Sequence, residues 1–454
     1  MSPDCGSAII GELSSFISKS GDIQLPNEVI TKAKHHIIDT LASIVYGSRL
    51  KPGLVAQKFA ENQKGVEEAQ VIGTPVITSA INAAMVNGIM AHADETDDFD
   101  PRYRIHPGAS IVPAALAISE REGTDGISFL KGVVAGYEIA CRIIQALGPD
   151  SLTKAGRSTH GIGNNFGAAA AAASILKLKP EPVRYVLSYT AQQVSGMLYW
   201  ARDEEHIEKG FLFGGMPARN GVTAAIFGQL GFTGIRDAFS GENNFFTCTS
   251  PDSEPELLLE GLGNRYEIMD VYIKKFPVGG PIQAALDALL LLIKKHGIAA
   301  CDVQSINVNI PSSRVVDNRD MPDINLQYLL ATVLIEGKLT AETAHSYERM
   351  NLPEITELKK RITLTDAPGL STPGAMRQAK VEIVTIEGFR FSDLVTQVRG
   401  SPQNPMTTEE IEGKSLDLLI PVLGEARSCD LIKRVWNLEQ THNMRELRPL
   451  LSVS

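Results

Sequence analysis

The spacing of apolar residues changes along this chain, and that change constrains the fold more than any other feature. In the first 265 or so residues, apolar side chains recur every three or four positions, which is typical of amphipathic helices. A run of six alanines after Phe166 indicates close packing between helices. We expect helices over residues 26–46, 79–91, 111–122, 126–147, 166–178, 184–199 and 218–230.

The pattern alternates after residue 265, which predicts strands. The range 303–310 fits one strand, and the ranges 380–386 and 389–398 fit two more, joined by Glu387-Gly388 as a hairpin turn. Between them, the range 325–336 is typical of a helix. This part of the chain is therefore predicted to be α+β.

A chain of 454 residues is too long for one ordinary hydrophobic core, so two domains are expected. After Pro405 the chain turns helical again, with Thr407 as a helix N-cap ahead of acidic residues. We predict a mainly α fold: a large helical-bundle domain formed by both chain ends, residues 1–265 and 399–454, and a smaller α+β lid domain, residues 266–398.

Composition excludes several classes of partner. The net charge of −10 is spread along the chain without a basic stripe, so no nucleic-acid partner is expected. Five scattered cysteines without CxxC spacing indicate a reducing compartment. No apolar run is long enough for a membrane helix, and the first residues lack the basic region of a signal peptide. We expect a cytoplasmic protein with no membrane partner.

Carboxylates and histidines cluster in one short segment. Glu95, Asp97 and Asp98 lie between His92 and His106. Such a cluster is costly to bury unless it is paired, hydrated or used, so it indicates proton chemistry or metal binding. If the helix that precedes it continued, His92 and Glu95 would share a face with Thr96. The spacing matches neither HExxH nor an EF-hand loop, and we predict no metal.

Three later segments carry further candidate residues. The glycine-rich stretch around His160 follows polar residues, not a strand, so we expect a helix N-terminus that can receive an anion, with His160 beside it, and no bound dinucleotide. Lys209 and Arg219 flank a glycine-rich loop that opens a helix. Lys274 precedes a Phe-Pro pair. None of these segments predicts a cofactor.

Taken together and in this order, the four segments resemble the MmgE/PrpD family, which includes 2-methylcitrate dehydratases, cis-aconitate decarboxylases and an iminodisuccinate epimerase. The resemblance rests on the AH-x-x-[DE]-x-DD segment with a later His-Pro, on K-x(4)-G-x(4)-RNG from Lys209, and on K-x-[FY]-P from Lys274. A late G-x-x-x-NPM-[ST]-x-E-E pattern from Gly400 completes it.

The resemblance implies a homodimer that acts on small di- or tricarboxylates without a metal or an organic cofactor. It implies that Lys209 and Lys274 bind substrate carboxylates, with Arg104, Arg219 and the lid residue Tyr328 as further substrate-binding candidates.

For proton transfer, histidine suits the base because its pKa lies near neutrality. His106 is the first choice as base and His160 the second, one of them serving as acid. Glu95, Asp97 or Asp98 would orient a histidine and stabilise its cation.

This chain departs from the family pattern at several positions. Glu95 stands where members usually carry Asp, Phe99 where they carry a hydroxyl, and Leu212 where many carry a histidine. The decarboxylases also carry a histidine shortly after the Phe-Pro, where this chain has Val278. We therefore favour a lyase that dehydrates a 2-methylcitrate-like hydroxy acid. An epimerase or a decarboxylase is the alternative, and a non-catalytic carboxylate-binding protein is the alternative of another class.

Overall fold

The computed structural model describes residues 3–372 and 375–453, with the first side chains described from residue 8. Helices take up 59% of the chain and strands 9%, so the fold is mainly α with a small α+β part, which confirms the predicted class. The chain divides into two compact units. We call residues 1–93, 97–271 and 418–454 the helical unit, and residues 94–96 and 272–417 the mixed unit.

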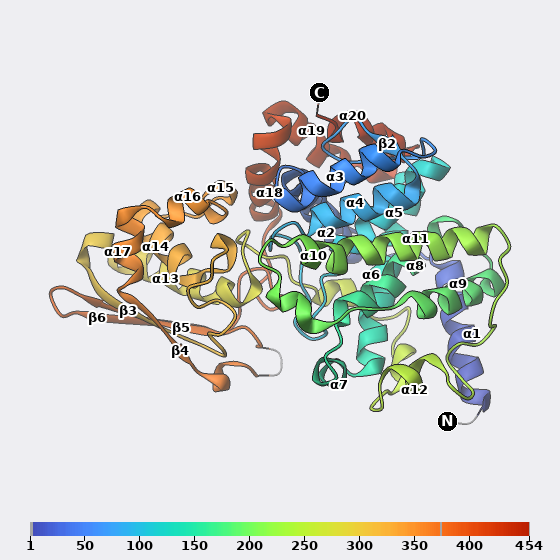
Figure 1. Ribbon diagram of the computed structural model, residues 1–454, viewed down its shortest axis with the longest axis horizontal. Helices are drawn as coiled ribbons and strands as arrows, with labels where there is room; N and C mark the ends of the chain where they lie inside the picture. The colour runs from blue at the N-terminus through green and yellow to red at the C-terminus, as the bar shows by residue number, and fades with distance from the viewer. Residues whose placement is uncertain (1–2, 373–374, 454) are drawn as a thin grey trace. The chain divides into compact units, whose positions relative to one another are not determined.

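The helical unit contains most of the helices, which Figure 1 shows in blue, green and red. A two-residue antiparallel ladder, Ala69–Gln70 with Ile77–Thr78, is β1 and β2. The helices are α1 (Pro3–Lys19), α2 (Asn27–Gly47), α3 (Lys51–Gln63), α4 (Ala80–Ala91), α5 (Gly108–Glu122), α6 (Gly126–Leu147), α7 (Pro149–Lys154), α8 (Thr159–Ile175), α9 (Pro180–Gln193), α10 (Ile207–Gly210), α11 (Met216–Gln229), α12 (Phe245–Thr249), α19 (Glu425–Trp436) and α20 (Arg448–Leu451).

Helix α8 forms the centre of this unit, because every one of its residues is buried. It packs against α6 on one side and α11 on another. Its alanines leave room for neighbouring helices to approach closely, as the alanine run predicted. His160 is the second residue of this buried helix, so close packing around α8 holds its backbone in place.

The last residues of the chain return to the helical unit through specific bonds. Arg448 Nε donates to Glu120 Oε2 at 2.6 Å, and Gly73 N donates to the carbonyl of Leu451 at 2.8 Å. These contacts attach α20 to the first third of the chain. Both chain ends consequently contribute to one helical core.

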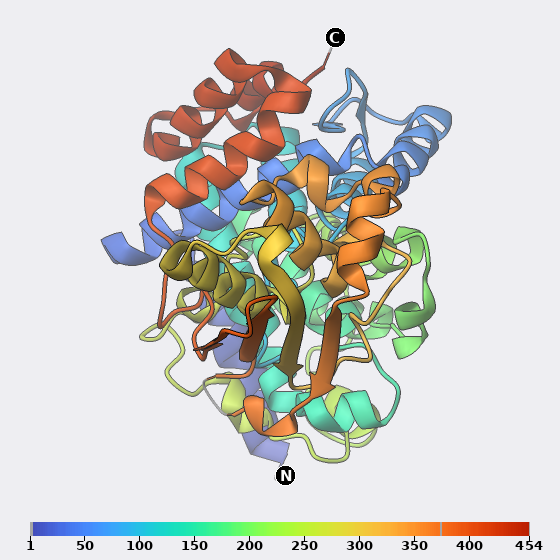
Figure 2. The ribbon, with the colours of Figure 1, turned by 90° about the vertical axis from the view of Figure 1, so that its left-hand side faces the viewer.

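The mixed unit is a four-stranded sheet with helices on one of its sides (Figure 1). The strand order is β4-β3-β5-β6, and Figure 2 shows the strands side by side. The β3–β4 pair is parallel, whereas β5 is antiparallel to both of its neighbours. The elements are α13 (Gln283–His296), β3 (Val303–Ile310), α14 (Leu326–Glu336), α15 (Ala341–Ala344), α16 (Tyr347–Met350), α17 (Pro353–Lys359), β4 (Ile362–Asp366), β5 (Ala379–Thr385) and β6 (Arg390–Val395).

The predicted hairpin is confirmed, since β5 and β6 pair with Val384 opposite Arg390. Gly388 has φ +88°, a backbone conformation that suits glycine in a tight turn.

The predicted N-cap at Thr407 is confirmed too. Thr407 Oγ1 accepts from the backbone N–H of Glu410 at the start of α18 (Thr408–Leu423), whose residues include the 417/418 boundary between the units. Among the described residues, no helix is both long and apolar enough to cross a membrane.

Candidate functional site

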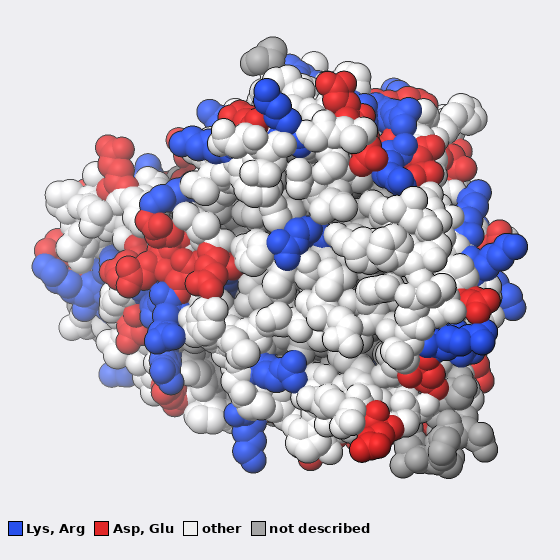
Figure 3. Space-filling model, turned by 45° about the vertical axis from the view of Figure 1, so that its right-hand side comes forward, with Lys and Arg blue, Asp and Glu red and all other residues white. Residues whose placement is uncertain are grey.

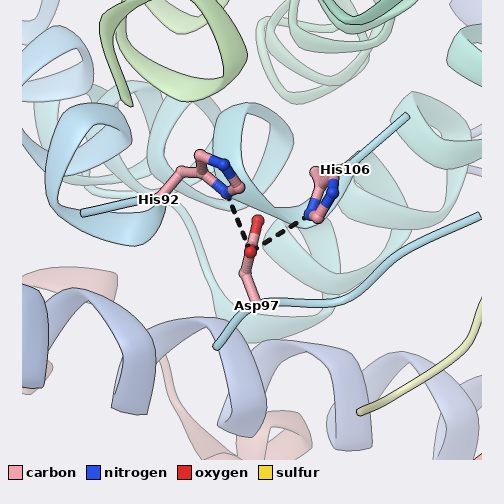
Figure 4. Close-up of side chains that lie close together, drawn as sticks. All are labelled: His92, Asp97 and His106. Carbon is pink, nitrogen blue, oxygen red and sulfur yellow. Dashed lines mark hydrogen bonds and ion pairs between the residues drawn. The ribbon is translucent and has the colours of Figure 1, made fainter. Parts of the chain in front are cut away.

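A carboxylate lies between two imidazoles in the interior of the helical unit. The Nδ1 of His92 is 2.9 Å from Asp97 Oδ1, and the Nδ1 of His106 is 3.1 Å from the same oxygen (Figure 4). All three side chains are buried. An ionised carboxylate can only accept hydrogen bonds, so both Nδ1 atoms carry the proton. The Nε2 atom of each ring is then the one that can take up a proton.

The charge of Asp97 suits this arrangement. Burial by itself would raise the pKa of its carboxyl group, but the charges and hydrogen bonds of His106 and His92 hold that pKa well below its usual range. Asp97 is therefore ionised at neutral pH. A fixed negative charge at this distance stabilises the cation that forms when either histidine accepts a proton.

His160 extends the cluster. Its ring stacks on Phe213, with centroids 3.5 Å apart, and its centroid lies 5.4 Å from that of His106. Burial, and then the charges of His106, His92 and Lys209, lower the pKa of His160 well below its ordinary value, so the ring is neutral.

The tautomer of the neutral His160 ring depends on its Nδ1 neighbour. That Nδ1 lies 3.3 Å from Ser158 Oγ, while its buried Nε2 has no hydrogen-bond partner among the described residues. If the serine hydroxyl donates to Nδ1, the Nε2–H is available to a bound molecule. The fold therefore places the hydroxyl of Ser158 against the ring of His160.

The loop that carries Asp97 is not the continuation of a helix. Helix α4 ends at Ala91, close to the predicted end of the 79–91 helix, so His92 and Glu95 do not share a helix face with Thr96. The physical reason is local. Asp94 Oδ1 accepts from the backbone N–H of Thr96 at 2.9 Å, and such a side-chain bond competes with helical hydrogen bonding.

Asp98 faces away from the histidine pair and into the helix core. Its Oδ2 accepts from Tyr137 Oη at 2.5 Å and lies 2.7 Å from His36 Nδ1, while its Oδ1 accepts from the backbone N–H of Gly108 at 3.0 Å. Two adjacent aspartates thus have different surroundings: Asp97 contacts the imidazole pair, and Asp98 ties the loop to α2, α6 and the start of α5. Sequence reasoning missed His36 and Tyr137, which lie far from the motif in the chain.

Lys209 lies beside the histidine cluster. Its Nζ is 5.2 Å from the centroid of the Trp200 ring and 5.3 Å from that of Phe213, the ring on which His160 stacks. Its backbone N–H donates to Asp203 Oδ2. The ammonium group of Lys209 thus lies over aromatic rings next to a neutral imidazole, and its role in substrate binding stays a prediction.

The glycines after Lys209 form a π-helical turn, Phe211–Gly215, where the sequence predicted a loop. A Cβ on Gly214 would lie 1.9 Å from the carbonyl oxygen of Gly88, so only glycine lets this turn pack on α4. The turn brings Phe213 against the ring of His92, with centroids 4.5 Å apart. Single π-helical turns of this kind are frequent at functional sites.

His206, Trp200 and Phe213 were not predicted from the sequence. The ring centroid of His206 lies 5.2 Å from that of His92, and His206 has φ +62°, a strained value for a residue with a side chain. No motif marks His206. Its position three residues before Lys209 is the only sequence signal near it.

Two predicted arginines lie in other surroundings. Arg104 Nη2 pairs with Asp150 at 2.5 Å near the surface. Arg219 Nε donates to the side chain of Asn220, and its guanidinium carbon is 5.7 Å from the centroid of the Phe211 ring. Neither contact involves the histidine cluster, and the roles of both arginines in substrate binding stay predictions.

The mixed unit holds the other predicted residues. Buried Lys274 donates from Nζ to the carbonyl oxygen of Glu95 at 2.6 Å, and the same Nζ is 3.6 Å from Glu95 Oε2. The hydroxyl of the fully buried Tyr328 donates to the carbonyl oxygen of Thr343. Lys274 and Glu95 are therefore brought together, whereas Tyr328 bonds to its own unit's backbone.

Ligand atoms of His92, Asp97 and His106 all lie within 4.8 Å of one another, close enough to hold a metal ion. The two hydrogen bonds to Asp97 Oδ1 already account for this closeness. The three residues form a hydrogen-bonded group, and the absence of a metal among them stays a prediction.

Comparison with known proteins identifies the family. The profile of the MmgE/PrpD N-terminal domain matches residues 11–258, and that of the MmgE/PrpD C-terminal domain matches residues 276–438. The two matches cover most of the chain. The protein belongs to the MmgE/PrpD family, which confirms the resemblance drawn from the motifs.

Similar curated proteins carry decarboxylase names. A cis-aconitate decarboxylase-like protein of Aspergillus oryzae is 22% identical over 98% of this chain and 97% of its own length. Cis-aconitate decarboxylase of Aspergillus terreus is 21% identical over 98% of this chain and 96% of its own length. The human cis-aconitate decarboxylase is 24% identical over 94% and 91%, respectively.

Proposed function

We propose that this protein is a cofactor-independent lyase that removes a proton next to a carboxylate of a small polycarboxylic acid. Its preferred reaction is the dehydration of a 2-methylcitrate-like hydroxy acid. The observation that carries the proposal is the Asp97 carboxylate shared by His92 and His106, beside the neutral His160. Family membership and the similarity to cis-aconitate decarboxylases support chemistry on a carboxylate.

His106 is the base in this mechanism. Its Nδ1–H is held by Asp97, so the Nε2 lone pair accepts the proton from the carbon acid. The carboxylate of Asp97 then lies against an imidazolium and lowers the free energy of the charged intermediate. This is the role that an aspartate plays toward histidine in many acid/base sites.

Negative charge that develops on the substrate carboxylate is met by His160 and Lys209. With Ser158 Oγ donating to Nδ1, the neutral His160 ring carries its proton on the buried Nε2 and donates a hydrogen bond without a charge of its own. The ammonium group of Lys209 supplies the positive charge. A fixed donor of this kind, in a site that excludes water, contributes about 3 kcal/mol to stabilisation of the transition state.

Dehydration is completed when the carbon–oxygen bond to the leaving hydroxyl breaks. The electron pair of the C–H bond forms the carbon–carbon double bond, and the hydroxide leaves as water with a proton from an imidazolium of the His92–His106 pair. Atoms balance with no oxidant and no co-reactant.

Decarboxylation is the second candidate, and the names of the similar curated proteins favour it. The same site would stabilise the same type of carbanion, formed by loss of carbon dioxide and quenched by a proton from an imidazolium. Against it, Val278 stands where the decarboxylases carry a histidine after the Phe-Pro.

A substrate screen tests the proposal. Purified protein is incubated with citrate-type, aconitate-type and amino-dicarboxylate acids, and products are read by mass spectrometry. Loss of water supports the dehydratase, and loss of carbon dioxide supports the decarboxylase. No change of mass in any acid, together with measurable binding, would contradict the lyase, and deuterium incorporation from heavy water would then separate the epimerase from the non-catalytic alternative.

The variant Lys209→Met sharpens this screen. We expect it to raise KM or to lower kcat by about a hundredfold, because a charged contact to the substrate is lost. Lys154→Met, on an exposed position of α7, is the matched control and should leave both constants unchanged. Equal kinetics in the two variants would remove Lys209 from the site.

A homodimer is part of the proposal. The helical unit exposes large apolar side chains in one short stretch of the chain: Leu230 is 66% exposed, Phe232 47% and Ile235 64%. Figure 3 shows a broad area with few charged side chains on the face that it presents. Large apolar side chains that are exposed close together are typical of a contact with another protein. Light scattering after size-exclusion chromatography should give twice the mass of one chain.

A further inference from the structure

The segment Asp94–Thr96 belongs to the mixed unit, although the residues on both sides of it belong to the helical unit. Two buried lysines of the mixed unit hold its backbone. Lys274 Nζ donates to the carbonyl oxygen of Glu95 at 2.6 Å, and Lys414 Nζ donates to that of Thr96 at 3.0 Å.

A third positive group holds the side chain of Asp94. The Nε2 of His345 lies 3.0 Å from Asp94 Oδ2 and 4.0 Å from Asp323 Oδ2. The Nδ1 of His345 is 2.7 Å from the carbonyl oxygen of Ala341, which can only accept, so Nδ1 carries a proton. With two carboxylates in front of Nε2, that nitrogen is protonated as well, and the ring is an imidazolium.

Asp94 also shapes the backbone of the segment. Its Oδ1 accepts from the N–H of Thr96 at 2.9 Å, and its Oδ2 accepts from the hydroxyl of Thr96 at 2.8 Å. Together these bonds close a turn over Glu95. Because Thr96 directly precedes Asp97, the turn also fixes the direction in which the chain enters the residue that holds the histidine pair.

We propose that His345 is a positioning residue of the reaction: as a cation it holds the Asp94 turn, and the turn fixes Glu95 on Lys274 and the entry into Asp97. The expected effect of His345 on turnover rests on the proposed function. His345 lies outside every motif of the family resemblance, and its distance from Asp94 in the chain hides the pair from the sequence.

The pH dependence follows from the groups that face His345. Burial lowers its pKa, but Asp94, Asp323 and the Ala341 carbonyl raise it further, to about 9. At neutral pH the ring is charged and the turn is held. Above pH 9 the ring loses its proton, so we expect kcat to fall on the alkaline side.

Three variants test the proposal by steady-state kinetics across pH. His345→Gln keeps a hydrogen-bond donor but no charge, and we expect kcat to fall about tenfold to a hundredfold with KM little changed. His345→Lys keeps a charge with a higher ordinary pKa, about 10.4, and should restore most of kcat and move its alkaline loss to higher pH. His296→Gln, an exposed histidine of the same unit, should match the wild type.

Amide hydrogen exchange gives a readout that does not depend on turnover. In His345→Gln, the Thr96 amide should exchange faster than in the wild type, because its acceptor on Asp94 is no longer held. Unchanged exchange would overturn the inference, as would a loss of kcat that His345→Lys fails to restore. If the wild type converts no acid at all, the proposed function fails, and the exchange comparison alone still decides whether His345 holds the turn.

Should circular dichroism show that His345→Gln does not fold, Thr96→Val replaces it. This variant removes one bond to Asp94 Oδ2 and leaves His345 in place. Faster exchange in the segment with a fall in kcat supports the inference, and wild-type values for both overturn it.

Discussion

The carboxylate of Asp97 accepts a hydrogen bond from the Nδ1–H of His106, at 3.1 Å, where both side chains are almost completely shielded from solvent. This bond fixes the tautomer of the ring and leaves Nε2 as the basic atom. Because the same carboxylate oxygen also meets His92, one negative charge supports two potential cations. Loss of that charge is expected to affect proton transfer more than it affects the fold.

Asp97→Asn should therefore lower kcat on the order of a thousandfold, because the amide cannot stabilise an imidazolium and can donate to the wrong ring nitrogen. Asp430→Asn, at an exposed position of α19, is the matched control and should retain wild-type turnover. The measurement is kcat at saturating substrate for both variants. If Asp97→Asn lowered kcat by only about threefold or less, the charge of Asp97 would not take part in proton transfer.

Burial of His160 should make the free energy of unfolding depend on pH. Its pKa is lowered in the folded protein, chiefly by burial, so the unfolded chain binds a proton at higher pH than the folded chain does. The free energy of unfolding should fall as pH drops below about 6.5, by at most about 1.4 kcal/mol per pH unit from this group. Chemical denaturation of the wild type and of His160→Gln at several pH values checks this. A slope that is the same in both proteins would contradict the assignment.

His36 is expected to be important for stability. It lies 2.7 Å from Asp98 with both side chains fully buried, so His36→Leu leaves a buried carboxylate short of a partner. We expect the free energy of unfolding to fall by about 3 kcal/mol. His35→Leu, on the same helix with its ring against Trp436, is the control and should lose about 1 kcal/mol or less. Equal losses would show that Asp98 does not depend on His36.

Close packing of the π-helical turn on α4 should make the stability of the protein sensitive to a side chain at Gly214. Gly214→Ala places a Cβ 1.9 Å from the carbonyl oxygen of Gly88, so we expect destabilisation by about 3 kcal/mol or more. Gly413→Ala, within α18, meets nothing within 4 Å and should stabilise the protein by about 0.5–1 kcal/mol, because alanine favours helix. Thermal unfolding of both variants checks the opposite signs.

Hydrophobic spacing was sufficient to predict the elements that rest on local sequence. Helix α6 spans Gly126–Leu147, as expected, and the β5–β6 hairpin forms around Glu387-Gly388. Strand β4 was missed, because this short strand joins the sheet only through parallel pairing with β3, a contact between residues far apart in the chain.

The candidate site was only partly predictable. Motif spacing predicted Asp97 and His106 as site residues, and the two are hydrogen-bonded in the structure. It did not separate Asp97 from Asp98, whose different partners depend on which way the loop turns after Asp94. His36 and His345 lie far from the motif, and their contacts arise only from tertiary packing.

In the proposed reaction, His106 moves a proton at a carbon next to a carboxylate. The most direct measurement is deuterium incorporation at that carbon, read by mass spectrometry of recovered acid after incubation in heavy water. The wild type should exchange the proton or convert the acid, and His106→Gln should lose both by about a hundredfold or more. His442→Gln, exposed on the same unit, should behave as the wild type. Equal exchange by His106→Gln and the wild type would show that His106 is not the base.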